Sequence, residues 1–155
     1  MQAIIIPDFG VLTVATIVCD YNGTLAVDGV LLPGVKEAIN KITDLDIHVI
    51  TADTFGVVEE QLKGCACHVT IAPLEDQAQW KLKYIRELNP KTTVCIGNGR
   101  NDRLMLKESA LGIALVQREG ASVEAMLAAD IVCTSALHAL EYFSNYKRLI
   151  ATLRS

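Results

Sequence analysis

The sequence predicts an α/β fold, a three-layer α/β/α sandwich around a mostly parallel, Rossmann-like sheet. Two observations lead to this prediction. Short runs of β-branched residues alternate with amphipathic helical stretches, and several runs are continuously apolar, as expected of strands buried on both faces. The chain has 155 residues, 51% of them hydrophobic, which is enough for one domain with a substantial core. Because no repeat or linker divides it, we expect a single domain over residues 1–155.

At the N-terminal end we expect a β-hairpin, followed by strands and helices in alternation. The hairpin strands are residues 2–7 and 11–14, joined by the turn sequence Asp-Phe-Gly. The sheet strands are expected at residues 16–20, 46–51, 68–72, 92–97, 112–116 and 131–133. The helices are expected at residues 33–43, 55–63, 75–88, 102–108 and 121–128, with a last helix from about residue 136.

The helix predictions rest on the spacing of apolar residues and on the residues at the helix ends. In residues 33–43 the apolar side chains recur at i, i+3, i+4 and i+7, and Pro33 suits a first helical turn. Gly64 is typical of the residue that ends a helix, here the second one. Ser135 is a candidate N-cap residue for the last helix.

Composition disfavours several classes of function. The formal net charge is -4, so the chain lacks the cationic surface that binding to nucleic-acid phosphates requires. Its apolar runs are too short to cross a bilayer, and the N-terminus shows no secretory signal. We therefore expect a cytoplasmic protein with no membrane insertion and no nucleic-acid partner.

The five cysteines are interpreted as structural residues. Cys19, Cys95 and Cys133 lie in apolar runs, where a thiol usually behaves as a small buried hydrophobe. Cys65 and Cys67 form a Cys-x-Cys pair, but the zinc patterns with a reliable spacing need a second ligand pair, which the sequence lacks.

Three of the predicted strands end in polar residues, and in a parallel sheet such residues meet at one edge. Residues 20–25 read Asp-Tyr-Asn-Gly-Thr-Leu, residues 51–53 read Thr-Ala-Asp, and residues 97–102 read Gly-Asn-Gly-Arg-Asn-Asp. A carboxylate at the end of a buried strand is costly unless a cation or hydrogen bonds compensate it. Gly23 allows a sharp turn whose N–H groups can face an anion. The carboxylate and amide oxygens of residues 97–102 suit Mg²⁺.

Lys81 supplies an ammonium group that can reach the same edge. It falls on the apolar face of the predicted third helix, between Ile85 and Leu88. An ammonium group on an apolar face needs an anionic partner, unless its stem runs along the core and its charge stays in water. The position alone leaves both interpretations open.

Each of these residues has an ordinary structural interpretation as well: Asp20 as a turn former, Thr51 as a strand residue, Asp102 as an acid in the first turn of a helix. The combination is more specific. A nucleophilic carboxylate, a hydroxyl, an ammonium group and a second acidic loop all fall where strand ends converge. Together these groups describe a phosphoryl-transfer site, in which a carboxylate attacks and cations and hydrogen bonds neutralise the transferring group.

At these residues the sequence resembles the haloacid dehalogenase-like (HAD) superfamily. Residues 20–25 are similar to its first motif, an Asp followed two places later by an acid and then by Gly-Thr. Residues 51–53 are similar to the Thr-Gly-Asp of P-type ATPases, Lys81 matches the lysine of the third motif, and residues 97–102 resemble Gly-Asp-Gly-x-Asn-Asp. The chain most resembles small soluble HAD proteins related to the phosphorylation domain of P-type ATPases. The four motifs occur in the family's order and span nearly the whole chain.

The resemblance implies a Mg²⁺-dependent phosphohydrolase, a phosphatase or P-type ATPase-like enzyme, that forms an aspartyl-phosphate. Its substrate is expected to be a small phosphorylated compound or phosphoryl donor. The resemblance implies Asp20 as the nucleophile. The metal ion would be held by Asp20, the Asn22 backbone carbonyl, Asn98 and Asp102. The phosphoryl group would be bound by Thr51 and Lys81, in a loop shaped by Gly23 and Thr24, and the surrounding shell would include Asp53 and Asn101.

The sequence departs from the family pattern at two catalytic positions. Family phosphatases have an aspartate at the place of Asn22, which protonates the leaving group and later activates water. A carboxamide can do neither, and because general acid–base catalysis contributes typically about 10²–10⁴-fold, we expect slow hydrolysis of poor leaving groups. The ATPases also lack an acid there. Asn98 replaces the first aspartate of the fourth motif, which removes a negative charge and is expected to weaken Mg²⁺ affinity.

The sequence leaves no room for a cap domain between the motifs. Residues 26–32 can form only a short flap, and the elements predicted between Thr51 and Lys81 use up that segment. An uncapped site cannot exclude water by itself, so a neighbouring subunit of a homo-oligomer or a large substrate is expected to cover it.

Two other functions remain open from the sequence. Because Asn22 and Asn98 each replace a carboxylate, the chain could be a low-activity regulatory or binding protein that holds phosphate or a phosphoaspartate without efficient turnover. A receiver domain of a signalling relay is also α/β, with Asp, Thr and Lys near Mg²⁺. Its phospho-acceptor, however, lies mid-chain, whereas Asp20 ends the first sheet strand and is followed by Gly-Thr.

Overall fold

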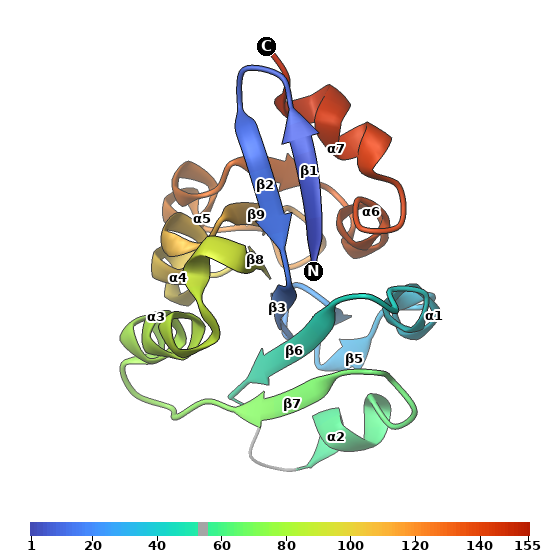
Figure 1. Ribbon diagram of the computed structural model, residues 1–155. Helices are drawn as coiled ribbons and strands as arrows, with labels where there is room; N and C mark the ends of the chain where they lie inside the picture. The colour runs from blue at the N-terminus through green and yellow to red at the C-terminus, as the bar shows by residue number, and fades with distance from the viewer. Residues whose placement is uncertain (53–55) are drawn as a thin grey trace.

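The computed structural model describes residues 1–52 and 56–155, and a six-stranded parallel sheet lies at its centre (Figure 1). Its strands are β3 (Thr16–Asp20), β6 (Asp46–Thr51), β7 (His68–Ile71), β8 (Thr93–Gly97), β9 (Leu111–Leu115) and β10 (Ile131–Cys133). They lie in the order β10-β9-β8-β3-β6-β7, and each neighbouring pair is parallel. The predicted α/β class and parallel sheet are confirmed.

The continuous apolar runs of the sequence are the strands at the centre of this sheet. All five residues of β3, of β8 and of β9 are buried. Cys19, Cys95 and Cys133 are buried free thiols, as predicted. A strand buried on both faces needs apolar side chains at every position, which explains why these segments show no alternation of polar and apolar residues.

Helices cover both faces of the sheet, which makes the three layers visible in Figure 1. The helices are α1 (Val35–Asn40), α2 (Val57–Gln61), α3 (Gln77–Leu88), α4 (Arg103–Glu108), α5 (Val123–Ala128), α6 (Ala136–Glu141) and α7 (Tyr146–Leu153), with short 3₁₀ turns η1 (Pro90–Thr92) and η2 (Arg100–Asp102). Ile50 belongs to the buried cluster that contains Ile85 of α3. The next residue back, Val49, belongs to the cluster on the opposite face, with Ile39 of α1 and Leu149 of α7.

Two antiparallel hairpins are added to the sheet. β1 (Gln2–Ile6) and β2 (Gly10–Val14) form the predicted N-terminal hairpin, which packs against α7. β4 (Ala26–Val27) and β5 (Val30–Leu31) form a second, very short hairpin where the sequence predicts a flap. Within residues 1–52 and 56–155 no further domain is inserted between the site motifs, and no helix of that part is both long and apolar enough to span a bilayer.

The first helix is shorter than predicted. Expected over residues 33–43, it covers only Val35–Asn40. Gly34 is the N-cap residue and has a left-handed backbone with φ of 83°. Pro33 therefore precedes the helix, and the assignment of Pro33 to its first turn is wrong. The second helix, expected over residues 55–63, is described over Val57–Gln61, and residue 55 lies outside the described residues.

The single last helix predicted from about residue 136 is also wrong, because the structure contains two helices there. α6 ends at Glu141 and α7 begins at Tyr146, after the N-cap residue Asn145. Ser144 and Asn145 favour turns and caps over helix interiors, since their side chains compete for backbone hydrogen bonds. The break allows α7 to turn back and contact β1.

The chain order of the strands reverses beside β3. After β3 the chain builds β6 and β7 on one side, and then returns to form β8 on the other side. In doubly wound sheets the crevice at such a reversal, beyond the carboxyl ends of the strands, is the usual binding site. This edge of the sheet carries Asp20, at the end of β3, and the loop that follows β8.

Candidate active site

One buried ammonium group joins the two carboxylates at this crevice. Lys81 Nζ lies 2.6 Å from Asp20 Oδ1 and 2.6 Å from Asp102 Oδ1, and donates a hydrogen bond to each. Lys81 is 1% exposed, Asp102 0% and Asp20 8%. The acid that ends β3, the helix α3 and the loop after β8 therefore converge on one point, although they are 61 and 21 residues apart in sequence. We call Asp20, Lys81 and Asp102 the buried triad.

The electrostatics of the triad follow from its burial. Burial and the neighbouring Asp102 carboxylate raise the pKa of Asp20 to about 7, although Lys81 acts in the opposite direction. Burial by itself would lower the pKa of Lys81, but the Asp20 and Asp102 carboxylates outweigh it and hold that pKa above its ordinary value. Lys81 is therefore charged at neutral pH, and with both carboxylates ionised the triad has a formal charge of -1. A buried site with a negative excess is stabilised by a further cation.

The loop after β8 holds Asp102 in place through its other oxygen. Asp102 Oδ2 accepts hydrogen bonds from the backbone N–H groups of Asn98, at 3.0 Å, and Gly99, at 2.9 Å. A Cβ atom at Gly97 would lie 2.5 Å from this same oxygen, so any larger residue there would displace the carboxylate. Gly97, the first glycine of the Gly-Asn-Gly sequence, is thus required by the close approach of Asp102.

The turn after β3 is packed against Asn98. Gly23 has a left-handed φ of 78°, and a Cβ atom there would lie 2.2 Å from Asn98 Nδ2. The Thr24 hydroxyl is fully buried, 3.4 Å from Asp20 Oδ2 and 3.3 Å from Asn98 Oδ1, and its one proton can serve either oxygen. The Asn98 amide group donates to the Gly120 carbonyl, which leaves its oxygen on the Thr24 side. We call residues 21–25 the phosphate loop.

Gln117 is hydrogen-bonded to the backbone of the phosphate loop, and its role was not predicted from the sequence. Its Nε2 donates to the carbonyl oxygens of Thr24, at 2.8 Å, and Gly23, at 3.3 Å. Its Oε1 accepts from the N–H of Ala136, at 2.8 Å. Because Gln117 lies two residues beyond β9, the strand-end argument that found Asp20 could also have found it.

Comparisons with known proteins agree with this architecture. No family model matches the chain. An uncharacterized protein of Methanocaldococcus jannaschii is 45% identical over 78 residues, which cover 48% of this chain and 84% of that protein, and the two belong to one family. Among solved structures, the 3-deoxy-D-manno-octulosonate 8-phosphate phosphatase of Moraxella catarrhalis is similar with a TM-score of 0.71 and 14% identity, over 91% of this chain and 94% of that one. That structure is a complex with magnesium, phosphate and KDO.

Two more solved structures share the same arrangement. A cobalt-bound phosphatase of the same kind from Haemophilus influenzae is similar with a TM-score of 0.67 and 12% identity, over 91% of this chain and 90% of that one. A HAD-family protein of Streptomyces avermitilis gives a TM-score of 0.65 and 17% identity, over 84% of each chain. The chain has the HAD fold. The resemblance inferred from four short motifs thus extends to the architecture of nearly the whole chain.

Within this HAD fold, the other predicted site residues lie around the triad. Thr51 is buried at the end of β6, one residue beyond the Ile50 that pairs with Asp20. Asn101 donates to Gln77 Oε1 at 2.6 Å and so links η2 to the first turn of α3. The Asn22 side chain is exposed. Asp53, predicted in the surrounding shell, lies outside the described residues.

The chemistry of the candidate site's oxygen atoms suits a divalent metal ion. In the described part of the chain, no three His, Cys, Asp or Glu side chains gather in a group that could hold a metal. The oxygen atoms gathered at the site are the carboxylates of Asp20 and Asp102 and the amide oxygen of Asn98, which the Thr24 hydroxyl links to Asp20. Hard oxygen donors of this kind suit Mg²⁺, which keeps several ligand positions for water and phosphate. A divalent ion would also change the formal charge of the triad from -1 to +1, which favours binding of a phosphoryl group.

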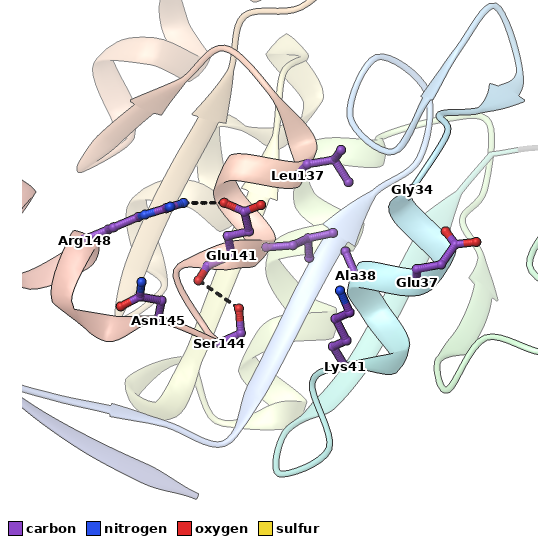
Figure 2. Close-up of a pocket in the computed structure, with 10 residues that line it drawn as sticks. Gly34, Glu37, Ala38, Lys41, Leu137, Glu141, Ser144, Asn145 and Arg148 are labelled. Carbon is purple, nitrogen blue, oxygen red and sulfur yellow. Dashed lines mark hydrogen bonds and ion pairs between the residues drawn. The ribbon is translucent and has the colours of Figure 1, made fainter.

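A hollow of about 440 Å³ lies elsewhere, between α1 and the α6–α7 pair (Figure 2). Lys41, Leu137 and Arg148 are among its lining residues, and none of the predicted site residues is. Arg148 donates to the Glu141 carboxylate, so this cation is already paired. The candidate site therefore rests on the buried triad and not on the volume of this hollow.

Proposed function

We propose that this chain is a Mg²⁺-dependent phosphohydrolase that acts through an aspartyl-phosphate on Asp20. The observation that carries the proposal is the position of Lys81 Nζ, 2.6 Å from both Asp20 and Asp102 at the carboxyl edge of the sheet. A lysine and two acids buried together contribute little net stability to a fold, and such groups are concentrated at functional sites, which supports a catalytic use for them. The HAD fold of the chain supports the same function.

The proposed reaction begins with attack of an Asp20 carboxylate oxygen on phosphorus. A phosphorus–oxygen bond to Asp20 forms while the bond to the leaving group breaks, and the leaving group departs with the bonding electron pair. Lys81 and Thr51 would bind the phosphoryl oxygens, and the N–H groups of the phosphate loop would face them. Mg²⁺ held by Asp20, Asn98, Asp102 and the Asn22 carbonyl would neutralise the developing negative charge.

Asn22 determines which substrates can react. Its carboxamide cannot give a proton to the leaving group, so that group must be stable as an anion. Acyl phosphates and phenyl phosphates meet this condition, whereas simple alkyl phosphates do not. Water then attacks the aspartyl-phosphate without a carboxylate base at this position, so we expect a slow second step and an accumulating phosphoenzyme. This combination favours a P-type ATPase-like chemistry over an efficient phosphatase.

The substitution Asn22→Asp tests the assignment of this position. We expect it to raise turnover of a poor leaving group, such as glycerol phosphate, by about 10²-fold, since general acid–base catalysis contributes this much. Turnover of p-nitrophenyl phosphate should rise less in its first step, because p-nitrophenolate leaves without a proton. Values of kcat/KM, which report the first step, are obtained from initial rates with Mg²⁺, and with EDTA as the metal-free control, and they check both expectations. An unchanged rate with glycerol phosphate would show that Asn22 does not occupy the acid position.

A further inference from the structure

One glutamine side chain connects three elements around the phosphate loop. Gln61, the last residue of α2, accepts hydrogen bonds at Oε1 from the Tyr21 hydroxyl, at 3.0 Å, and from the Leu31 N–H, at 2.6 Å. Its Nε2 donates to the Gly29 carbonyl at 2.8 Å. Gln61 belongs to none of the four sequence motifs. Its side chain nevertheless forms three hydrogen bonds, to residues that lie 30 to 40 positions earlier in the chain.

The first of these partners is the residue directly after the proposed nucleophile. Tyr21 is fully buried, and its carbonyl oxygen accepts from the N–H groups of Thr24, Leu25 and Ala26 at 2.9–3.2 Å. The phosphate loop is therefore wound around the Tyr21 backbone, while the Tyr21 side chain reaches Gln61. A shift of Gln61 would therefore move Tyr21, and with it the backbone to which the phosphate loop is hydrogen-bonded.

The other two partners belong to the flap, residues 26–32, which contains the β4–β5 hairpin. Its turn at Asp28 and Gly29 has φ angles of 52° and 75°, and each of its strands is two residues long. An isolated two-stranded hairpin of this length is not stable in water. Gln61 binds the C=O of Gly29 and the N–H of Leu31, so its carboxamide bonds to the free edge of β5 as a neighbouring strand would.

We propose that Gln61 is a positioning residue that holds the flap beside the phosphate loop, so that the flap takes part in binding substrate at a site to which the described residues add no cap domain. This inference rests on the proposed function for its second half only. A carboxamide is required because one group must accept from an N–H and donate to a C=O. Glutamate can make the first bond but not the second, and leucine can make neither.

The first test is amide exchange at Leu31, which needs no enzymatic activity. We expect Gln61→Leu to speed exchange of this N–H by about tenfold, the change expected from loss of a hydrogen bond of ordinary net strength. Gln61→Glu keeps an acceptor for Leu31 and Tyr21, and should give a smaller increase. The matched control is Gln79→Leu, an exposed glutamine of α3, which should leave exchange at Leu31 unchanged.

The second test is the division of the effect between KM and kcat. With p-nitrophenyl phosphate and Mg²⁺, Gln61→Leu should raise KM about tenfold and change kcat less than about threefold, because ground-state and transition-state binding are weakened together. Should Gln61→Leu fail to fold, Gln61→Glu carries both measurements. Native exchange at Leu31 in the variants would overturn the proposal, and so would faster exchange with an unchanged KM. If the native chain turns over no phosphate compound, the proposed function fails, whereas the exchange result still decides whether Gln61 holds the flap.

Discussion

Asp20→Asn should lower turnover by roughly 10³-fold or more, because the substitution replaces the attacking carboxylate with a carboxamide. The same substitution should not destabilise the protein. Burial and Asp102 make the charged form of Asp20 unfavourable, as its raised pKa shows, and asparagine is neutral and nearly the same shape. Lys81 keeps its bond to Asp102 at 2.6 Å. Initial rates with acetyl phosphate and p-nitrophenyl phosphate, together with urea denaturation, measure the two effects.

The matched control for this variant is Asp46→Asn. Asp46 is exposed at the opposite end of the sheet, where β6 begins. The rates and the stability of the Asp46→Asn variant should therefore equal those of the native chain. Turnover that survives Asp20→Asn would contradict the mechanism. Native protein that is labelled by acetyl phosphate but releases almost no phosphate would favour the other function that the sequence left open, a protein that holds a phosphoaspartate without efficient turnover.

Lys81→Met should destabilise the protein by about 3–5 kcal/mol at pH 8 in EDTA, since it leaves two buried carboxylates without their cation. Loss of Lys81 also removes the charge that acts against the rise in the pKa of Asp20. At pH values between the two pKa values, the folded variant binds a proton at Asp20 that the unfolded chain, with an ordinary carboxyl pKa, does not bind. The free energy of unfolding of the variant therefore falls as pH rises from the ordinary carboxyl pKa of the unfolded chain through the raised pKa of the folded one. The loss of stability relative to the native chain should be smaller at pH 5 than at pH 8.

Urea denaturation at the two pH values checks this sign, and Lys83→Met is the control. Lys83 lies on the same helix two residues away and is exposed, so its replacement should change stability by less than about 0.5 kcal/mol at either pH. If the penalty for Lys81→Met were equal at pH 5 and pH 8, the two carboxylates would not be coupled as the geometry indicates. Mg²⁺ should restore part of the stability at pH 8, because it replaces the missing positive charge.

The sequence was most informative where chemistry and burial impose one residue type. Asp20 and Asp102 could be placed at one edge because parallel strands bring their carboxyl ends together. Lys81 could be assigned to the apolar face of its helix from spacing alone, but snorkelling to solvent and pairing with acids were equally consistent with that spacing. The structure decides between them, since Lys81 is 1% exposed and bonded to both acids.

The parts that the sequence did not reveal depend on contacts made by neutral side chains. Gln61 and Gln117 act through hydrogen bonds to backbone groups, and such bonds can be made by a glutamine anywhere on a surface. Helix ends were missed for a similar reason. Gly34 could have continued a turn or capped a helix, and only its left-handed φ of 83° shows that the helix begins after it. Local propensity is weak where tertiary contacts set the outcome.

A crystal structure of the protein with Mg²⁺ and beryllium trifluoride tests the central claim most directly. Beryllium trifluoride bonds to a nucleophilic carboxylate as a phosphoryl group would. The account predicts a bond from beryllium to an Asp20 oxygen, Lys81 Nζ on a fluorine atom, and the metal ion between Asp20 and Asp102. Beryllium on another residue, or a metal ion bound away from both acids, would contradict it.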